Sequence, residues 1–125
     1  LRCLVGSEMC IRDSRNNVAY VTHPYPQKVD APWEDKWERN WGHVADHYPV
    51  VATEMGYVVK GQRGEHIPCI GDEKYGEAII NYLDKKGISY TVWCFDPSWA
   101  PALLDDFDFN LTRQGAFFKR KLQMK

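Results

Sequence analysis

The chain has 125 residues, a formal net charge of −1 and 26% charged residues, a composition that is typical of a globular domain and excludes a disordered or fibrous chain. Lys and Arg are scattered among Asp and Glu and form no basic stripe, so we expect no nucleic-acid partner. No apolar run approaches the roughly 20 residues of a membrane span, so we also expect no membrane partner.

The first segment, residues 1–14, reads LRCLVGSEMCIRDS and shows neither helical nor strand periodicity. Its stretch LVGSEMCIRDS resembles a translated adaptor sequence of the kind found at the ends of reading frames assembled from metagenomic reads. We therefore predict that residues 1–14 are not native and leave them out of the fold. A native terminal strand over the same residues is the alternative.

Strands and helices alternate along the rest of the chain. Apolar, β-branched segments predict buried strands over residues 17–23, 49–56 and 88–96. Helices are predicted over residues 32–48, 72–87 and 112–125. The first helix begins at Pro32, and the second begins at Gly71 or Asp72 and ends at Gly87. Ile79, Ile80 and Leu83 are expected to form the buried side of the second helix.

This alternation predicts an α/β fold with parallel strands and right-handed crossovers. Three parallel strands alone leave two unpaired edges, so we expect the chain to be part of a larger sheet. The spacing of the strands fits a (β/α)8 TIM barrel of about 250 residues. We therefore predict that residues 15–125 are the C-terminal portion of such a barrel, about strands six to eight with their helices, and that its partner is the missing N-terminal part of the same barrel.

Polar or aromatic residues follow all three predicted strands. His23 and Tyr25 follow the first strand, Glu54 closes the second, and Trp93 and Asp96 lie at the end of the third. Active-site residues of (β/α)8 barrels come from the carboxyl ends of the strands. A single Glu after a strand is more often a surface residue or a helix cap, but the coincidence of three strand ends favours an active site.

The motifs HPY, TEMG and WCFDP, in this order and at these separations, resemble strands six, seven and eight of glycoside hydrolase family 5, the cellulase-like family of retaining barrel enzymes. The resemblance covers about residues 16–125. It implies that Glu54 is the catalytic nucleophile, that the Tyr25 hydroxyl orients it, and that His23 lines the cleft beside it. It also implies that Trp93 is the platform under the sugar at the cleavage point.

A retaining glycosidase needs a second carboxyl group as acid/base, about 5 to 5.5 Å from the nucleophile. In the resembled family this is a Glu preceded by Asn at the end of strand four, and the sequence contains no Asn-Glu dipeptide. We expect the acid/base to lie upstream and the 125-residue chain to be inactive by itself. Asp96 is the other acid at a strand end, where a hydrogen bond within the loop is its more ordinary role.

Trp33 and Trp99 lie in loops that follow predicted strands and could extend a sugar-binding surface. Packing at the start of its helix is the favoured role for Trp33, whereas Trp99 is predicted to bind substrate at an outer subsite.

The sequence predicts no metal site and no cofactor. The four cysteines form no CxxC pair, and we expect His43, His47 and His66 to have no acidic or Cys partner at ligand spacing. The loop of residues 105–110 begins like a calcium loop but lacks the required Gly and Glu.

The leading hypothesis is a secreted glycoside hydrolase of the endo-β-1,4-glucanase type that acts on β-glucan or β-mannan. A non-catalytic carbohydrate-binding barrel remnant is the alternative, and an Asn-Glu dipeptide upstream would favour the enzyme. A third hypothesis, a barrel hydrolase or lyase with a single Glu as base, predicts phosphate- or metal-binding groups after the last strands, which the sequence lacks.

Overall fold

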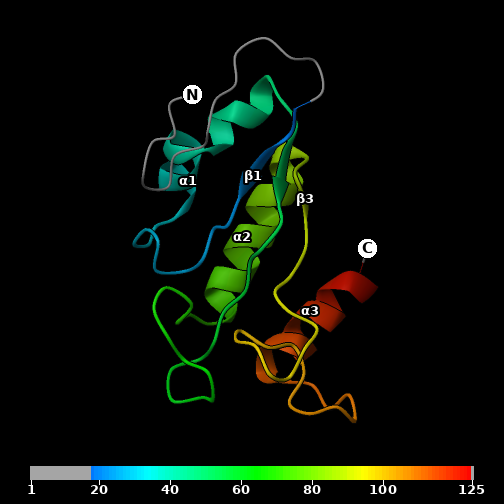
Figure 1. The fold of residues 1–125 in the computed structure, drawn as a ribbon. Coiled ribbons are helices and arrows are strands. Elements are labelled where there is room, and N and C mark those ends of the chain that lie inside the picture. The colour runs from blue at the N-terminus through cyan, green and yellow to red at the C-terminus, as the bar shows by residue number, and fades with distance from the viewer. Residues whose placement is uncertain (1–17, 125) are drawn as a thin grey trace.

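The computed structural model describes residues 18–124, and the segment predicted to be non-native lies outside them. Within the described part of the chain, three short strands alternate with helices (Figure 1). The strands are β1 (Tyr20–Thr22), β2 (Val50–Ala52) and β3 (Ser89–Tyr90). The helices are α1 (Glu34–Asn40), the 3-10 helix η1 (Gly42–Asp46), α2 (Glu73–Lys86) and α3 (Arg113–Gln123).

The strands form one parallel sheet in the order β1-β2-β3, which confirms the predicted topology. Tyr20 pairs with Val50, and Val51 pairs with Ser89, so the carboxyl ends of the strands lie at the same edge. The strands are shorter than predicted because the regular pairing of residues ends at Thr22, Ala52 and Tyr90. Beyond these residues the segments are joined by single hydrogen bonds, including one of 2.8 Å from the Trp93 N–H to the Met55 carbonyl.

Helix α2 runs along one face of the sheet and supplies much of the core (Figure 1). Ile79, Ile80 and Leu83 are buried on its inner side, as predicted. Asp72 begins the helix by accepting the N–H groups of Lys74 at 3.0 Å and Tyr75 at 3.3 Å. Gly87 ends it in the left-handed region, with φ 66°. The predicted start and stop of this helix are therefore confirmed.

Replacing Asp72 with Ala is expected to lower the free energy of unfolding by about 1 kcal/mol, because two N–H groups at the start of α2 lose their acceptor. Asp72→Asn keeps a side-chain acceptor and is the matched control. Urea unfolding of both variants measures the effect. Equal stability of the Ala and Asn variants would show that the cap contributes nothing.

The predicted helix over residues 32–48 is wrong as a single helix, because the chain leaves helical geometry at Trp41 and resumes as η1. The break is caused by contact with Tyr82 on α2. Gly42 lies so close to the Tyr82 hydroxyl that no Cβ fits between them. The Tyr82 hydroxyl donates to Glu38 Oε2 at 2.6 Å, and its ring meets Trp41 edge-on.

The tryptophans of this segment pack against the core and against one another. Trp37 is 1% exposed and Trp41 is 4% exposed. The Trp33 ring stacks on Trp37 with centroids 6.0 Å apart, and its indole N–H donates to the Pro26 carbonyl at 3.1 Å. Trp33 therefore packs at the start of its helix, which was its favoured role.

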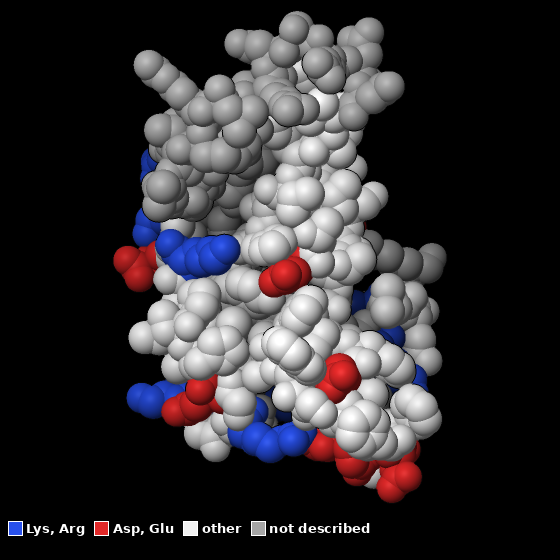
Figure 2. All heavy atoms as spheres, viewed as in Figure 1, with Lys and Arg blue, Asp and Glu red and all other residues white. Residues whose placement is uncertain are grey.

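None of the helices within residues 18–124 is long and apolar enough to cross a membrane. On the face shown in Figure 2, basic and acidic side chains lie next to one another on the left side and at the lower end, where acidic groups gather.

Candidate active site

The carboxyl edge of the sheet brings His23, Tyr25 and Glu54 together. His23 and Tyr25 follow β1, and Glu54 follows β2. The Tyr25 hydroxyl donates a hydrogen bond to Glu54 Oε2 at 3.1 Å, and His23 Nδ1 lies 3.5 Å from the same oxygen. Tyr25 and His23, which follow β1, therefore both approach Oε2 of Glu54, which follows β2.

The Tyr25 hydroxyl is a permanent donor. Tyr25 is 7% exposed, whereas the Glu54 side chain keeps 31% of its surface accessible. Burial first, and then the neighbouring Glu54 carboxylate, raise the pKa of Tyr25 far above its usual range. Tyr25 therefore stays protonated at any ordinary pH and donates to Glu54, which leaves the second carboxylate oxygen free of this bond.

A threonine next to Glu54 contacts the other nitrogen of the His23 ring. His23 Nε2 lies 2.9 Å from Thr53 Oγ1, and the Thr53 carbonyl accepts a hydrogen bond of 2.6 Å from the Thr91 hydroxyl. If the Thr53 hydroxyl donates to Nε2, the proton of a neutral His23 ring lies on Nδ1, on the side that faces Glu54. Sequence reasoning missed Thr53, although its place beside Glu54 marks it.

A buried tyrosine on α2 holds the loop that carries His23 and Tyr25. The Tyr75 hydroxyl donates to the Pro24 carbonyl, which lies between the two site residues in the chain. Tyr75 is fully buried, and this burial raises its pKa well above the ordinary value. Sequence reasoning missed this role, because Tyr75 lies on the apolar face of its helix like any core residue.

Trp93 lies beside the strand end that carries Glu54. It is half-buried, and its N–H donates to the carbonyl of Met55, the residue that directly follows Glu54. The peptide bond between Trp93 and Cys94 is cis. The carbonyl of Trp93 accepts a hydrogen bond of 3.2 Å from Gln114 Nε2 on α3. Both backbone groups of Trp93 are thus bonded to neighbouring segments.

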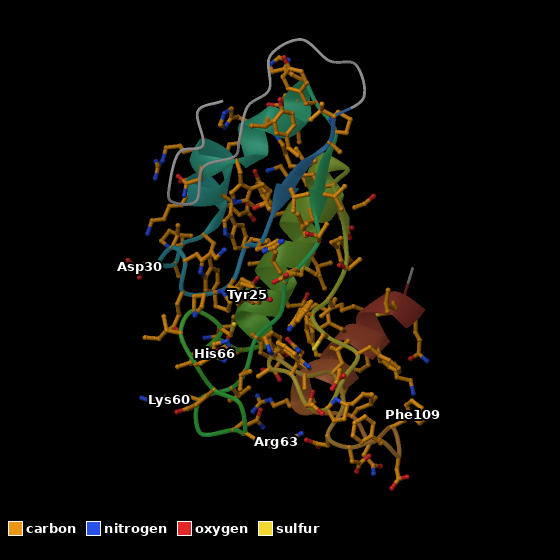
Figure 3. The ribbon with its side chains drawn as sticks, in the orientation of Figure 1. Tyr25, Asp30, Lys60, Arg63, His66 and Phe109 are labelled. Carbon is orange, nitrogen blue, oxygen red and sulfur yellow. The ribbon has the colours of Figure 1, made fainter. Side chains whose placement is uncertain are left out.

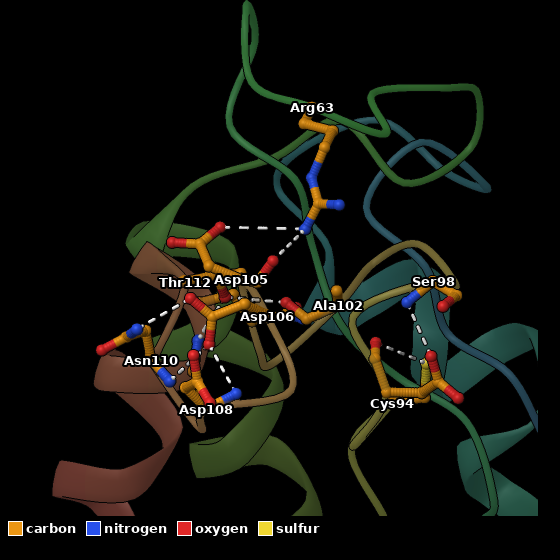
Figure 4. Close-up of polar contacts among 12 residues, drawn as sticks. Arg63, Cys94, Ser98, Ala102, Asp105, Asp106, Asp108, Asn110 and Thr112 are labelled. Atoms are coloured by element: carbon orange, nitrogen blue, oxygen red, sulfur yellow. Dashed lines mark hydrogen bonds and ion pairs between the residues drawn. The ribbon is translucent and has the colours of Figure 1, made fainter.

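Trp99 lies in a separate pocket between the loops that follow β2 and β3. It is 64% exposed, and the pocket has a volume of about 410 Å³. Arg63 crosses from one loop to the other and donates to the Asp105 carbonyl at 2.9 Å (Figures 3 and 4). The lining of this pocket does not include the residues that meet at Glu54.

Asp96 accepts the Ser98 N–H at 2.6 Å, the loop hydrogen bond expected as its ordinary role (Figure 4). The interpretation that His66 lacks a Cys partner is wrong, because its Nε2 lies 3.3 Å from Cys69 Sγ, three residues further along the chain. Burial raises the pKa of the Cys69 thiol to about 11, so this group is protonated at neutral pH.

The part of the chain that the structure describes contains no group of three or more His, Cys, Asp or Glu side chains placed to hold a metal ion. Cys69 and Cys94 are free thiols.

The fold and the site together define a segment of a parallel α/β protein, with a carboxylate and its tyrosine partner at the carboxyl edge of the sheet. The family model Cellulase (glycosyl hydrolase family 5) matches residues 7–98. The chain belongs to this family of glycoside hydrolases, whose members fold as (β/α)8 barrels, and the resemblance found in the sequence is confirmed.

Two solved structures of a β-glucanase from Saccharophagus degradans are similar to the chain. The native form has 46% sequence identity and a TM-score of 0.85, and the complex with cellotetraose has 45% identity and a TM-score of 0.84. Each match covers 88% of this chain and 34% of the β-glucanase chain, so this chain spans about a third of that protein's length. No curated protein matched the sequence.

Proposed function

We propose that the complete protein is a retaining glycoside hydrolase that cleaves β-1,4-linked glucan, with Glu54 as its nucleophile. Residues 15–125 contribute strands six to eight of the barrel, and a Glu in the preceding part of the chain is the acid/base. Tyr25 and His23 position Glu54, and Trp93 supports the sugar at the cleavage point. Substrate is the polysaccharide outside the cell, and Trp99 contacts it at an outer subsite.

The hydrogen bond from Tyr25 to Glu54 carries this proposal. A nucleophile of a retaining glycosidase must be held in one orientation, and a donor aimed at one of its oxygens does this. The other oxygen is then available to attack the anomeric carbon. The partial exposure of Glu54 fits a group that must meet substrate, whereas a structural carboxylate on a surface needs no buried donor.

The unfinished sheet supports a larger barrel. Val21 lies on the sheet face away from the buried Tyr20 and is 47% exposed. Beside β3, an apolar groove of about 510 Å³ runs between the strand and α3, where Phe95 and Leu122 are exposed. A domain that folds alone in water normally buries apolar sheet faces and grooves of this kind. Further strands and helices of the same barrel would cover both surfaces here.

The β-glucanase neighbour was solved with cellotetraose, which favours β-glucan over β-mannan as the substrate class. An exposed indole such as Trp99 offers a flat apolar face to the C–H groups of a pyranose ring. Arg63 and Asp105 add polar groups beside it that can bond sugar hydroxyls.

The proposed function is tested by following cellotetraose hydrolysis by the complete protein with proton NMR. A retaining enzyme releases the β-anomer first, and the α-anomer then appears by mutarotation. Initial release of the α-anomer would contradict the retaining mechanism. Absence of cleavage, with cellotetraose still bound, would favour the non-catalytic carbohydrate-binding alternative.

A further inference from the structure

One buried amide connects the segments that follow β2 and β3. Gln114, the second residue of α3, is 3% exposed and is the one buried residue with an amide or charged side chain in residues 18–124. Its Oε1 accepts the N–H of Tyr57, and its Nε2 lies within hydrogen-bonding distance of three backbone carbonyls. These carbonyls belong to Trp93 at 3.2 Å, Pro101 at 3.1 Å and Ala102 at 3.3 Å.

The surroundings of Gln114 fix the orientation of its amide. One side offers a donor, the Tyr57 N–H, and the other offers acceptors only. A reversed amide would place its NH2 against an N–H and its oxygen against carbonyl oxygens. The Pro101 and Ala102 carbonyls also accept the Cys94 N–H and the Thr112 hydroxyl. A residue of another shape or chemistry at position 114 therefore leaves chiefly the Tyr57 N–H and the Trp93 carbonyl without their partner.

Gly56 shows how closely these segments pack. A Cβ at this position would lie 2.6 Å from Gln114 Oε1 and 2.9 Å from the Trp93 carbonyl oxygen. The chain two residues after Glu54 therefore passes directly against both groups, and only a glycine fits there. Met55, between Glu54 and Gly56, is fully buried and accepts the Trp93 N–H at 2.8 Å.

We infer that Gln114 is a positioning residue that sets where Trp93 stands relative to Glu54. It bonds the Trp93 carbonyl on one side and the Tyr57 N–H on the other, and Tyr57 is three residues beyond Glu54. Gln114 acts through Trp93. The inference rests on the proposed function, because it assigns the spacing between the nucleophile and the sugar platform to a residue on α3.

The test replaces Gln114 with Met, which has a similar length and no amide, in the complete protein. We expect kcat/KM on cellotetraose to fall about 10-fold or more at a temperature where circular dichroism shows the variant to be folded, since misplacing a positioning group is costly. In a Trp93→Ala background the same replacement is expected to change kcat/KM less than twofold, because the group through which Gln114 acts is gone.

Ile80→Ala is the matched control. Ile80 is buried in the core on α2, away from the site, so its truncation lowers the melting temperature without touching Trp93. We expect it to leave kcat/KM near the wild-type value at the same temperature, with or without Trp93. If Gln114→Met lowers kcat/KM equally in both backgrounds, or leaves it unchanged, the inference is overturned.

Two further arms keep this test apart from the proposed function. Gln114→Asn, which retains an amide on a side chain one carbon shorter, replaces the Met variant if that variant does not fold, with the same expected coupling to Trp93. A crystal structure of the folded variant shows the position of the Trp93 ring whether or not the wild type cleaves glucan. A shift of the Trp93 ring relative to Glu54 supports the inference, and an unmoved ring contradicts it. An inactive wild type contradicts the proposed function only.

Discussion

Replacing Glu54 with Gln is expected to lower kcat/KM on β-glucan by about 1,000-fold or more. The amide has the size of the carboxylate and can still accept the Tyr25 hydroxyl, so the site should keep its geometry. An uncharged amide oxygen cannot form the glycosyl-enzyme ester that retention requires. Initial rates on cellotetraose, with the folded fraction checked by circular dichroism, measure the effect.

Asp96→Asn is the control for this variant. Asp96 is the other carboxylate at a strand end, and an Asn there keeps the acceptor for the Ser98 N–H. We expect its kcat/KM to stay within about threefold of the wild-type value, because loop substitutions away from the reacting atoms cost little. Survival of the Glu54→Gln activity within tenfold would show that Glu54 is not the nucleophile. A large loss of kcat/KM in Asp96→Asn alone would assign the role of nucleophile to Asp96 instead.

Replacing Tyr25 with Phe is expected to lower kcat/KM by about 10- to 100-fold, the loss that follows from removing a hydrogen bond to a charged group. The ring remains in its buried site, so the fold should survive. Without the hydroxyl, Glu54 Oε2 loses the donor that holds its orientation. Initial rates on cellotetraose measure the effect.

The alkaline limb of the pH–activity profile should be the same in Tyr25→Phe as in the wild type, because of the raised pKa of Tyr25. That pKa is raised far above its usual range, so the hydroxyl is neutral throughout the working pH range in the wild type and its titration adds nothing to the profile. Tyr48→Phe removes a hydroxyl from a tyrosine that is 57% exposed and should leave the profile unchanged. A kcat/KM that is unchanged in Tyr25→Phe would contradict the orienting role.

Local signals in the sequence predicted the parts of the fold that local chemistry determines. Asp72 and Gly87 bound α2 as predicted, because a cap and a left-handed glycine act within one turn of the helix. The parallel pairing of the strands followed from their alternation with helices. The convergence of Tyr25 and Glu54 was also predictable, because parallel strands bring their carboxyl ends to one edge.

Features that depend on distant partners were missed. The break at Trp41 comes from Tyr82, which lies about forty residues further along the chain and occupies the space next to Gly42. Gln114 is an ordinary polar residue at a helix start until the fold places it among the carbonyls of another loop. Neither contact leaves a periodic or motif signal, because each is made by tertiary packing.

The central claim, that Glu54 is the nucleophile of a retaining glycosidase, is tested most directly by trapping the covalent intermediate. A dinitrophenyl 2-deoxy-2-fluoro-β-cellobioside carries a leaving group that needs no acid, and its fluorine slows hydrolysis of the intermediate. We expect the complete protein to release dinitrophenolate in one burst and to gain the mass of the fluoroglycosyl group on the peptide that carries Glu54. A label on any other residue, or turnover of cellotetraose with no labelled protein, would contradict the claim.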